Sequence, residues 1–226
     1  MYKPGGTIKQ LLDKVASQEY ILPAIQREFV WWPEQICRLF DSLMQGYPFG
    51  TFLFWRIAPE KRQEYQFYDF VRDYHERDNY HCALLKVLPE RDLVAVLDGQ
   101  QRMTALNIGL RGSYAWKLPG KWWSSNDAFP IRHLYLDLLG EPDAETGSEY
   151  RFEFLTETAT ELTGEGQLWL RVCRVLVESE DDLIDSLDEI DLSADQRKQA
   201  KKVLRHLYRT VHHKELISCL LYTSPS

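Results

Sequence analysis

The sequence predicts an α/β (α+β) head followed by a mostly helical C-terminal extension. Short apolar runs typical of strands alternate with amphipathic helical repeats through residue 110. Two runs of alternating apolar and polar residues follow, and from Leu168 onward the pattern is helical. We therefore expect a head at residues 1–160 and a helical extension, itself incomplete, at residues 161–226.

The helices of the head have recognisable start and stop signals. Thr7 can cap a helix whose apolar residues repeat at helical spacing as far as Val15. Residues 20–23 read as extended, because the residue before a proline avoids the helical region. Pro33 suits the first turn of a second helix, and Gly46 is a natural end for it.

The strands of the head are predicted from apolar runs. Residues 51–57 are almost wholly apolar, which indicates a strand buried on both faces. Residues 63–69 and 93–97 are further strand candidates. A helix at 104–110 follows, ended by Gly112.

Two features organise the second half of the chain. Residues 134–138 and 151–155 alternate apolar and polar side chains, and the polar loop between them predicts a hairpin. Ser193 and Gln196 then form a plausible capping box at the start of a long basic helix.

Charge bounds the classes of partner. The net charge is −7 and the pI is about 5.4, which argues against a dedicated non-specific DNA-binding protein. The segment 196–209 is nevertheless strongly basic and follows a strongly acidic segment at 178–191. We favour a solvated helix whose charge is balanced by its neighbours over a nucleic-acid footprint.

Cysteine usage and targeting signals point to the cytoplasm. The four cysteines are scattered without a Cys-x-x-Cys pair, so zinc and a disulfide framework are poorly supported. The N-terminus lacks the layout of a secretion signal, and no apolar run reaches the length of a spanning helix. We therefore predict a cytoplasmic protein.

The most informative run is 94–106, V-A-V-L-D-G-Q-Q-R-M-T-A-L. An apolar strand ends at Asp98 and a helix-compatible segment begins within a few residues. The start of a helix can bind an anion through its free backbone N–H groups, and Arg102 adds a fork that suits phosphate. A second interpretation stays open, in which Asp98 is an N-cap and Arg102 makes a structural ion pair.

Three motifs in order carry a family resemblance. The sequences Y-I-L-P-x-I-Q-R-x-F-V-W, L-F-D-S-L-x-x-G-Y-P-F-G and V-L-D-G-Q-Q-R-x-T-A-L start at residues 20, 39 and 96. Together they resemble the N-terminal domain of GmrSD-type restriction endonucleases, over residues 7–220. The resemblance implies that the head has a ParB/sulfiredoxin-like fold.

The resemblance also implies roles for the turn. Asp98, Gln101 and Arg102 are the predicted catalytic residues, with Arg102 on phosphate oxygens and Asp98 holding Mg²⁺ or orienting the attacking water. Gly99 and Gln100 are predicted to contact the nucleotide, a nucleoside triphosphate of unknown base. The separate roles of the two glutamines stay open.

A second segment is predicted to contribute to binding. Pro23-x-x-Gln26-Arg27 is similar to the first motif of ParB-like domains, which makes Gln26 and Arg27 nucleotide-binding candidates. The alternative for Arg27 is an ion pair with a nearby glutamate. Tyr20 and Trp31 are predicted to contact DNA or a flipped base, although aromatic residues this dense more often pack in a core.

The resemblance predicts an NTP-binding and NTP-hydrolysing regulatory domain that senses modified DNA in a type IV-like restriction system, a defence against phage. It would control an HNH-type nuclease domain that this chain lacks, since neither that signature nor the family's phenylalanine–arginine–asparagine–glycine motif is found. The alternative is a non-catalytic ParB-like nucleotide switch or a DNA- or protein-binding module. A sulfiredoxin-like redox enzyme is disfavoured, because no cysteine lies next to residues 98–102. Homo-oligomerisation is left open.

Overall fold

The computed structural model describes residues 2–24, 28–86, 88, 92–161 and 166–222, and it confirms the α/β class. The helices are α1 (Ile8–Ala16), α2 (Pro33–Met44), α3 (Gln100–Arg111), α4 (Glu157–Glu161), α5 (Arg174–Val177), α6 (Glu180–Ser186) and α7 (Ala194–His212), with 3₁₀ turns η1 (Pro59–Glu64) and η2 (Asn126–Ala128). The strands are β1 (Tyr2–Thr7), β2 (Tyr20–Pro23), β3 (Thr51–Ile57), β4 (Phe67–Tyr68), β5 (Asp73–His75), β6 (Leu93–Asp98), β7 (Ser113–Ala115), β8 (Ile131–Asp137), β9 (Phe152–Leu155), β10 (Trp169–Arg171) and β11 (Glu215–Tyr222).

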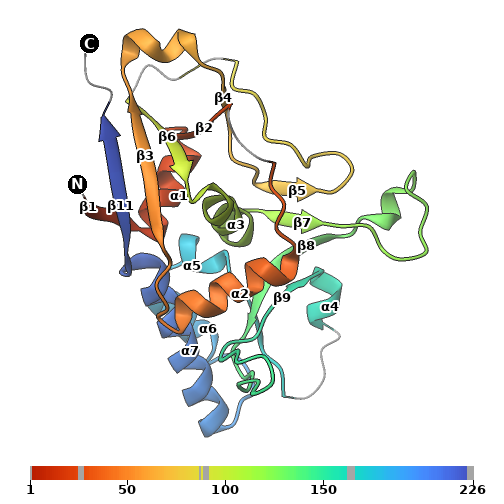
Figure 1. Cartoon of the computed structure of the whole chain (residues 1–226). Coiled ribbons are helices and arrows are strands. Elements are labelled where there is room, and N and C mark those ends of the chain that lie inside the picture. The colour runs from red at the N-terminus through yellow and green to blue at the C-terminus, as the bar shows by residue number, and fades with distance from the viewer. Residues whose placement is uncertain (1, 25–27, 87, 89–91, 162–165, 223–226) are drawn as a thin grey trace.

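The first sheet has the strand order β1-β11-β3-β6-β2-β4. The pairs β11–β3 and β2–β6 are parallel, and the other pairs are antiparallel. Strand β11 comes from the C-terminal extension and lies between β1 and β3 (Figure 1). The extension therefore completes the sheet of the head, while the predicted boundary at residue 160 stays a prediction.

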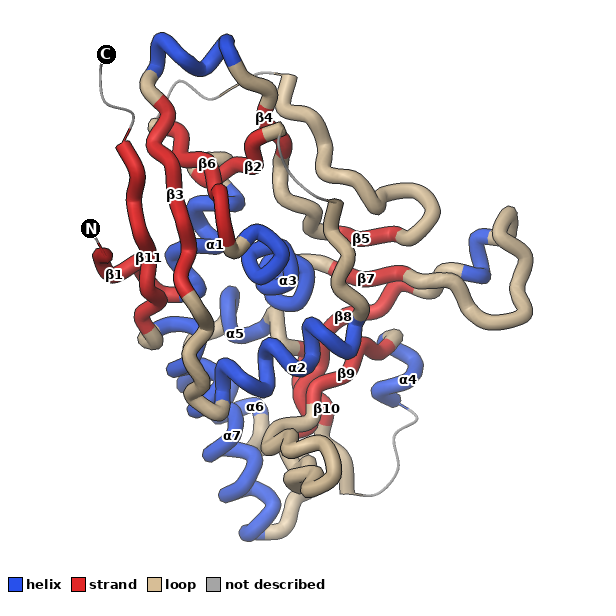
Figure 2. Tube along the Cα trace, in the orientation of Figure 1, coloured by secondary structure: helices blue, strands red, loops and turns tan. Residues whose placement is uncertain are grey.

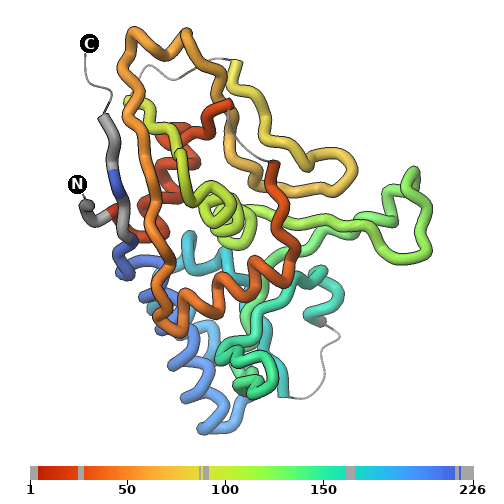
Figure 3. Tube along the Cα trace, in the orientation of Figure 1, coloured from red at the N-terminus to blue at the C-terminus, as the bar shows by residue number. Residues whose placement is uncertain are grey.

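The second sheet has the order β10-β8-β7-β5, with β9 paired to β8. The antiparallel β8–β9 ladder confirms the predicted hairpin. Helix α3 lies between the two sheets in the view of Figure 2. The segment between β7 and β8 protrudes from the body as a loop, seen in green in Figure 3.

Local signals correctly placed the starts of three helices. Thr7 and Ser193 each form a capping box, and Pro33 is the first residue of α2. Residues 103–110 of α3 are all buried, so this helix is the centre of the core. Among the described residues, no helix is both long and apolar enough to cross a membrane.

The structure corrects three expectations. Residues 63–69 are not one strand, because the proline-initiated 3₁₀ turn η1 occupies the start of that range and only β4 is extended. The extension is not helical throughout, since it contains β10 and β11. Strand β3 buries Phe52 and Phe54 fully, but Leu53 and Trp55 only partly.

Candidate functional site

The site is built around the turn between β6 and α3. Strand β6 ends at Asp98, and Gly99 takes the left-handed conformation with φ 86° as the N-cap of α3. A Cβ atom at Gly99 would overlap the Phe52 ring, so both the backbone angle and the packing require glycine. The interpretation of Asp98 as the N-cap is therefore wrong.

Gln101 ties the turn to the segment that precedes α2. Its Nε2 donates to the Glu28 carbonyl at 2.9 Å, and its Oε1 accepts from the Val30 N–H at 3.1 Å. The side-chain amide thus donates one hydrogen bond to this segment and accepts one from it, as the backbone of a neighbouring strand would. The same segment is fixed again at Trp31, whose carbonyl accepts the Tyr114 hydroxyl at 3.1 Å.

Arg102 ties the turn to the loop before β3. Its Nη1 donates to the Phe49 carbonyl at 2.5 Å, and its Nη2 donates to the Thr51 carbonyl at 2.9 Å. The guanidinium lies 5.2 Å from the centre of the Phe52 ring. Gly50, with φ 83°, leaves room for the guanidinium, because a Cβ there would overlap Nη1. The ion pair with Asp98 is longer, at 3.7 Å.

The Gln100 side chain turns back toward the preceding strand β6, where its Nε2 donates to the carbonyls of Val96 and Leu97. We call Gln100, Gln101 and Arg102 the polar clamp. The clamp joins three segments that are distant in sequence. In this structure all three side chains donate to backbone carbonyls, so their predicted contacts to nucleotide stay predictions.

Two features of the turn are left open to a ligand. The Asp98 side chain is 72% exposed, and among the described residues its ion-pair partner is Arg102. Helix α3, like α2 and α5, has no side-chain hydrogen bond at its N-cap, so the N–H groups of its first turn are available to a ligand or to water. An unsatisfied helix start next to a guanidinium attracts anions.

The donor set suits magnesium only together with a ligand. Within the described ranges, no group of three or more His, Cys, Asp or Glu side chains gathers as a metal site. Magnesium, however, is commonly held by one or two carboxylates together with substrate phosphates. Asp98 fits that pattern, because it is exposed and lies two residues before the first residue of α3.

The other predicted residues are placed differently. Gln26 and Arg27 lie outside the described residues, although Glu28 next to them is held at the turn. Tyr20 is 6% exposed and packs on Phe54 with ring centres 4.7 Å apart, which favours packing over base contact. Trp31 is half-buried, and its contact with DNA stays a prediction.

Sequence reasoning missed the part played by the loop that ends in Phe49, Gly50 and Thr51. Its backbone carbonyls receive Arg102, and Gly50 makes the close approach possible. The G-Y-P-F-G motif was a signal that this loop has special geometry. Nothing in that motif said which side chain the loop would bind.

Comparison with known proteins places the chain in a family. The model of the family described as GmrSD restriction endonuclease, N-terminal domain, matches residues 8–224. A stretch of 101 residues, 43% of the chain, is 39% identical to part of the uncharacterized protein MJ0686 of Methanocaldococcus jannaschii. That match spans 16% of the length of the archaeal relative.

Proposed function

The chain belongs to the GmrSD restriction endonuclease N-terminal domain family, and we propose that it binds and hydrolyses a nucleoside triphosphate to regulate a restriction system. Family membership indicates a component of such a system. The nucleotide, its hydrolysis, the sensing of modified DNA and the control of an HNH-type nuclease domain are the proposal.

One observation carries this proposal: the uncapped start of α3, the Arg102 guanidinium and the exposed Asp98 carboxylate meet at one turn. The first two are positive and suit phosphate oxygens. The third is negative and suits either a magnesium ion or a water proton.

Each residue at the turn has a separate role in the proposed hydrolysis. The N–H groups at the start of α3 hold a phosphate, and Arg102 stabilises the negative charge that develops on the leaving group. Asp98 orients the attacking water or holds the metal. Magnesium, when bound, would neutralise phosphate charge and polarise the bond that breaks.

Nucleotide binding would affect the rest of the domain through the polar clamp. Gln101 is adjacent to Arg102 and holds the backbone of Glu28 and Val30. The Val30 and Trp32 side chains on this segment are 65% and 58% exposed. A phosphate that draws Gln101 or Arg102 away from these carbonyls would release a surface available to DNA.

A non-catalytic nucleotide switch is the second candidate. It is favoured by the clamp itself, because all three of its side chains are hydrogen-bonded to backbone carbonyls. A switch of this kind would bind nucleotide and change the clamp without releasing phosphate. Binding without turnover would identify it.

The test is a thermal-shift and phosphate-release screen of the four NTPs with Mg²⁺. The Asp98→Asn variant removes the proposed metal or water ligand. Asp92→Asn is the matched control, because Asp92 is similarly exposed, at 69%, and precedes the other end of β6. We expect phosphate release by the parent and by Asp92→Asn, and none by Asp98→Asn.

Three outcomes would change the interpretation. Equal turnover by all three proteins would remove Asp98 from the reaction. A thermal shift without phosphate release would identify the switch. A parent protein that melts cooperatively and shows no shift with any NTP would overturn the nucleotide site itself.

A further inference from the structure

Helix α7 carries basic side chains on two faces that differ in their partners. On one face, Arg197 and Lys201 both bind Asp188, at 2.9 and 2.7 Å. Arg205 lies 3.8 Å from Glu180. The acidic segment before α7 thus balances the charge of this face, as the sequence suggested.

The adjacent face of α7 has no such balance. Lys198, Lys202 and Arg209 are exposed, and none has an ion pair with a carboxylate within the described part of the chain. All three line a groove of about 780 Å³ between α7 and the residues that follow β8. The groove therefore combines concave shape with uncompensated positive charge.

Two aromatic side chains that line the groove are fixed in place. The rings of Tyr150 and His206 stack with centres 5.6 Å apart. His206 is hydrogen-bonded through Nε2 to the Met44 carbonyl at 2.5 Å. The backbone N–H groups of Glu149 and Tyr150 both donate to the buried Asp41 carboxylate.

Two carboxylates line the groove, and one of them is already hydrogen-bonded within the protein. Asp137 is 2% exposed; it accepts the backbone N–H groups of Leu139 and Leu168 and lies 3.9 Å from Arg151. Glu149 is exposed at the rim. A fourth exposed cation, Arg205, also lines the groove and is paired with Glu180. The other three cations face one exposed carboxylate, so the local charge is positive in a chain whose net charge is −7.

We propose that this groove binds the sugar-phosphate backbone of DNA. Lys198, Lys202 and Arg209 form a row about 16 Å long on one helix face, at a rise of about 1.5 Å per residue. A row of cations matches a polymer of phosphates better than a single phosphate. Aromatic rings among the cations add a surface on which a sugar or base can pack.

Shape separates DNA from other anionic partners. A groove lined by cations suits a ridge of phosphates better than it suits the flat plane of a membrane. The choice of DNA over an acidic or phosphorylated peptide rests on the proposed function in restriction. The groove itself is independent of the nucleotide turn, since it shares no residue with the turn or the polar clamp.

The experiment compares two double variants that each remove two positive charges from α7. Lys198→Gln/Lys202→Gln empties the groove of two cations, and Arg197→Gln/Lys201→Gln removes the two that are paired with Asp188. Binding of a fluorescein-labelled DNA duplex is followed by anisotropy without nucleotide. Melting curves confirm that both variants fold.

The salt dependence gives the decisive readout. With three phosphate contacts, we expect parent affinity to fall about 40-fold between about 50 and 200 mM salt, because the slope is about −0.9 per contact. The groove variant should lose about fourfold over this range, and the control should behave as the parent does. Equal slopes for the two variants, or no DNA binding by the parent, would overturn the proposal.

Two further comparisons distinguish DNA from a phosphorylated peptide, and this proposal from the proposed nucleotide function. A phosphorylated peptide that competes as well as DNA of equal charge would overturn DNA as the partner. DNA binding that depends on the groove, in a protein that shows no thermal shift with any NTP, would keep this inference while the proposed nucleotide function failed. Nucleotide turnover without groove-dependent DNA binding would do the reverse.

Discussion

The two ends of the β3–β6 ladder are held by different forces. At one end Leu53 is paired with Asp98, and the polar clamp fixes the adjoining loops by hydrogen bonds to their carbonyls. At the other end Ile57 is paired with Leu93, and both side chains are buried in a small apolar cluster. The same pair of strands thus joins a polar region to an apolar one.

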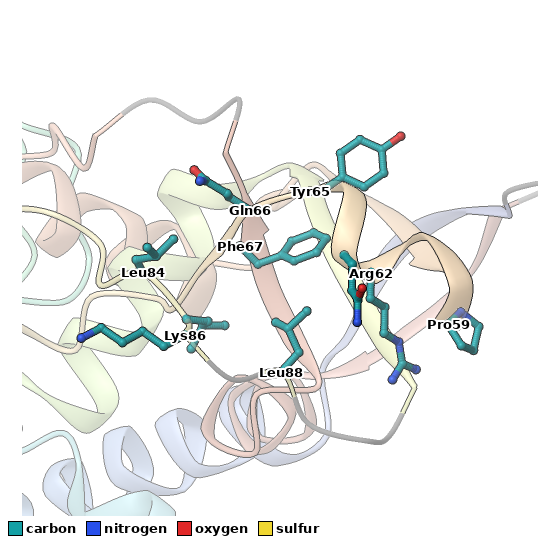
Figure 4. Close-up of a pocket in the computed structure, with 10 residues that line it drawn as sticks. Pro59, Arg62, Tyr65, Gln66, Phe67, Leu84, Lys86 and Leu88 are labelled. Carbon is teal, nitrogen blue, oxygen red and sulfur yellow. The ribbon is translucent and has the colours of Figure 1, made fainter.

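The apolar end also carries a pocket, of about 660 Å³. Figure 4 shows the Phe67 ring in the middle of this pocket, with the side chains of Leu88 and Arg62 beside it. Phe67 is 1% exposed and belongs to the apolar cluster. The surroundings of Phe67 indicate a role in packing. None of the described residues that line the pocket has a carboxylate comparable with that of Asp98.

The difference shows where directional bonds are used. Apolar packing stabilises in proportion to buried area and tolerates small displacements of the groups that make it. A hydrogen bond to a carbonyl fixes both distance and direction. The turn end therefore sets positions, as a site for a charged ligand requires, whereas the pocket end supplies stability.

The largest expected effect comes from the apolar end. Phe67→Ala should lower the free energy of unfolding by about 3–5 kcal/mol, because it empties a fully buried site. Urea denaturation measures this change. Nucleotide affinity per folded molecule should not change, and a loss of affinity would show that the two ends are not independent.

The second effect combines stability with binding. Arg102→Ala removes two charge-assisted hydrogen bonds to carbonyls and should cost about 3 kcal/mol, together with nucleotide binding. Arg102→Lys is the control, since it keeps the charge but cannot bridge both carbonyls. We expect it to restore part of the affinity and little of the stability. Full recovery of both by lysine would contradict the clamp.

Signals that act over a few residues were readable in the sequence. Thr7, Pro33 and Ser193 placed three helices, because capping depends on residues within one turn of the helix start. The turn at Asp98 was found for the same reason. Strand β11 was not found, because it is defined by pairing with β1 and β3, far away in sequence.

The contacts of the site were beyond the reach of local patterns. Gln101 bonds to a residue 73 positions earlier, and Arg102 to one 53 positions earlier. A motif indicates that such side chains have specific partners, but the fold determines which carbonyls they bind. Tyr20 illustrates the converse, since the same motif that pointed to a ligand contains a buried packing residue.

A smaller effect isolates one arm of the clamp. Gln101→Ala should cost about 1–2 kcal/mol, because it removes two hydrogen bonds and leaves the Val30 N–H without its partner. Hydrogen exchange at Val30 should become faster, while exchange at Met103, within α3, should not change. Protection of Val30 that survives the substitution would mean that Tyr114 and packing hold this segment without Gln101.

The smallest effect distinguishes the two exposed carboxylates at the ends of β6, Asp92 just before the strand and Asp98 as its last residue. Asp92 forms an ion pair with Arg56 at 2.6 Å, and Asp98 lies 3.7 Å from Arg102. Exposed pairs contribute about 0–1 kcal/mol, and salt screens them. Asp92→Asn should therefore destabilise slightly more than Asp98→Asn in low salt, and the difference should vanish in high salt, as measured by urea denaturation. A larger loss for Asp98→Asn that persists in high salt would mean that this carboxylate supports the turn itself, and the polar end would then owe its order to Asp98 as well as to the clamp.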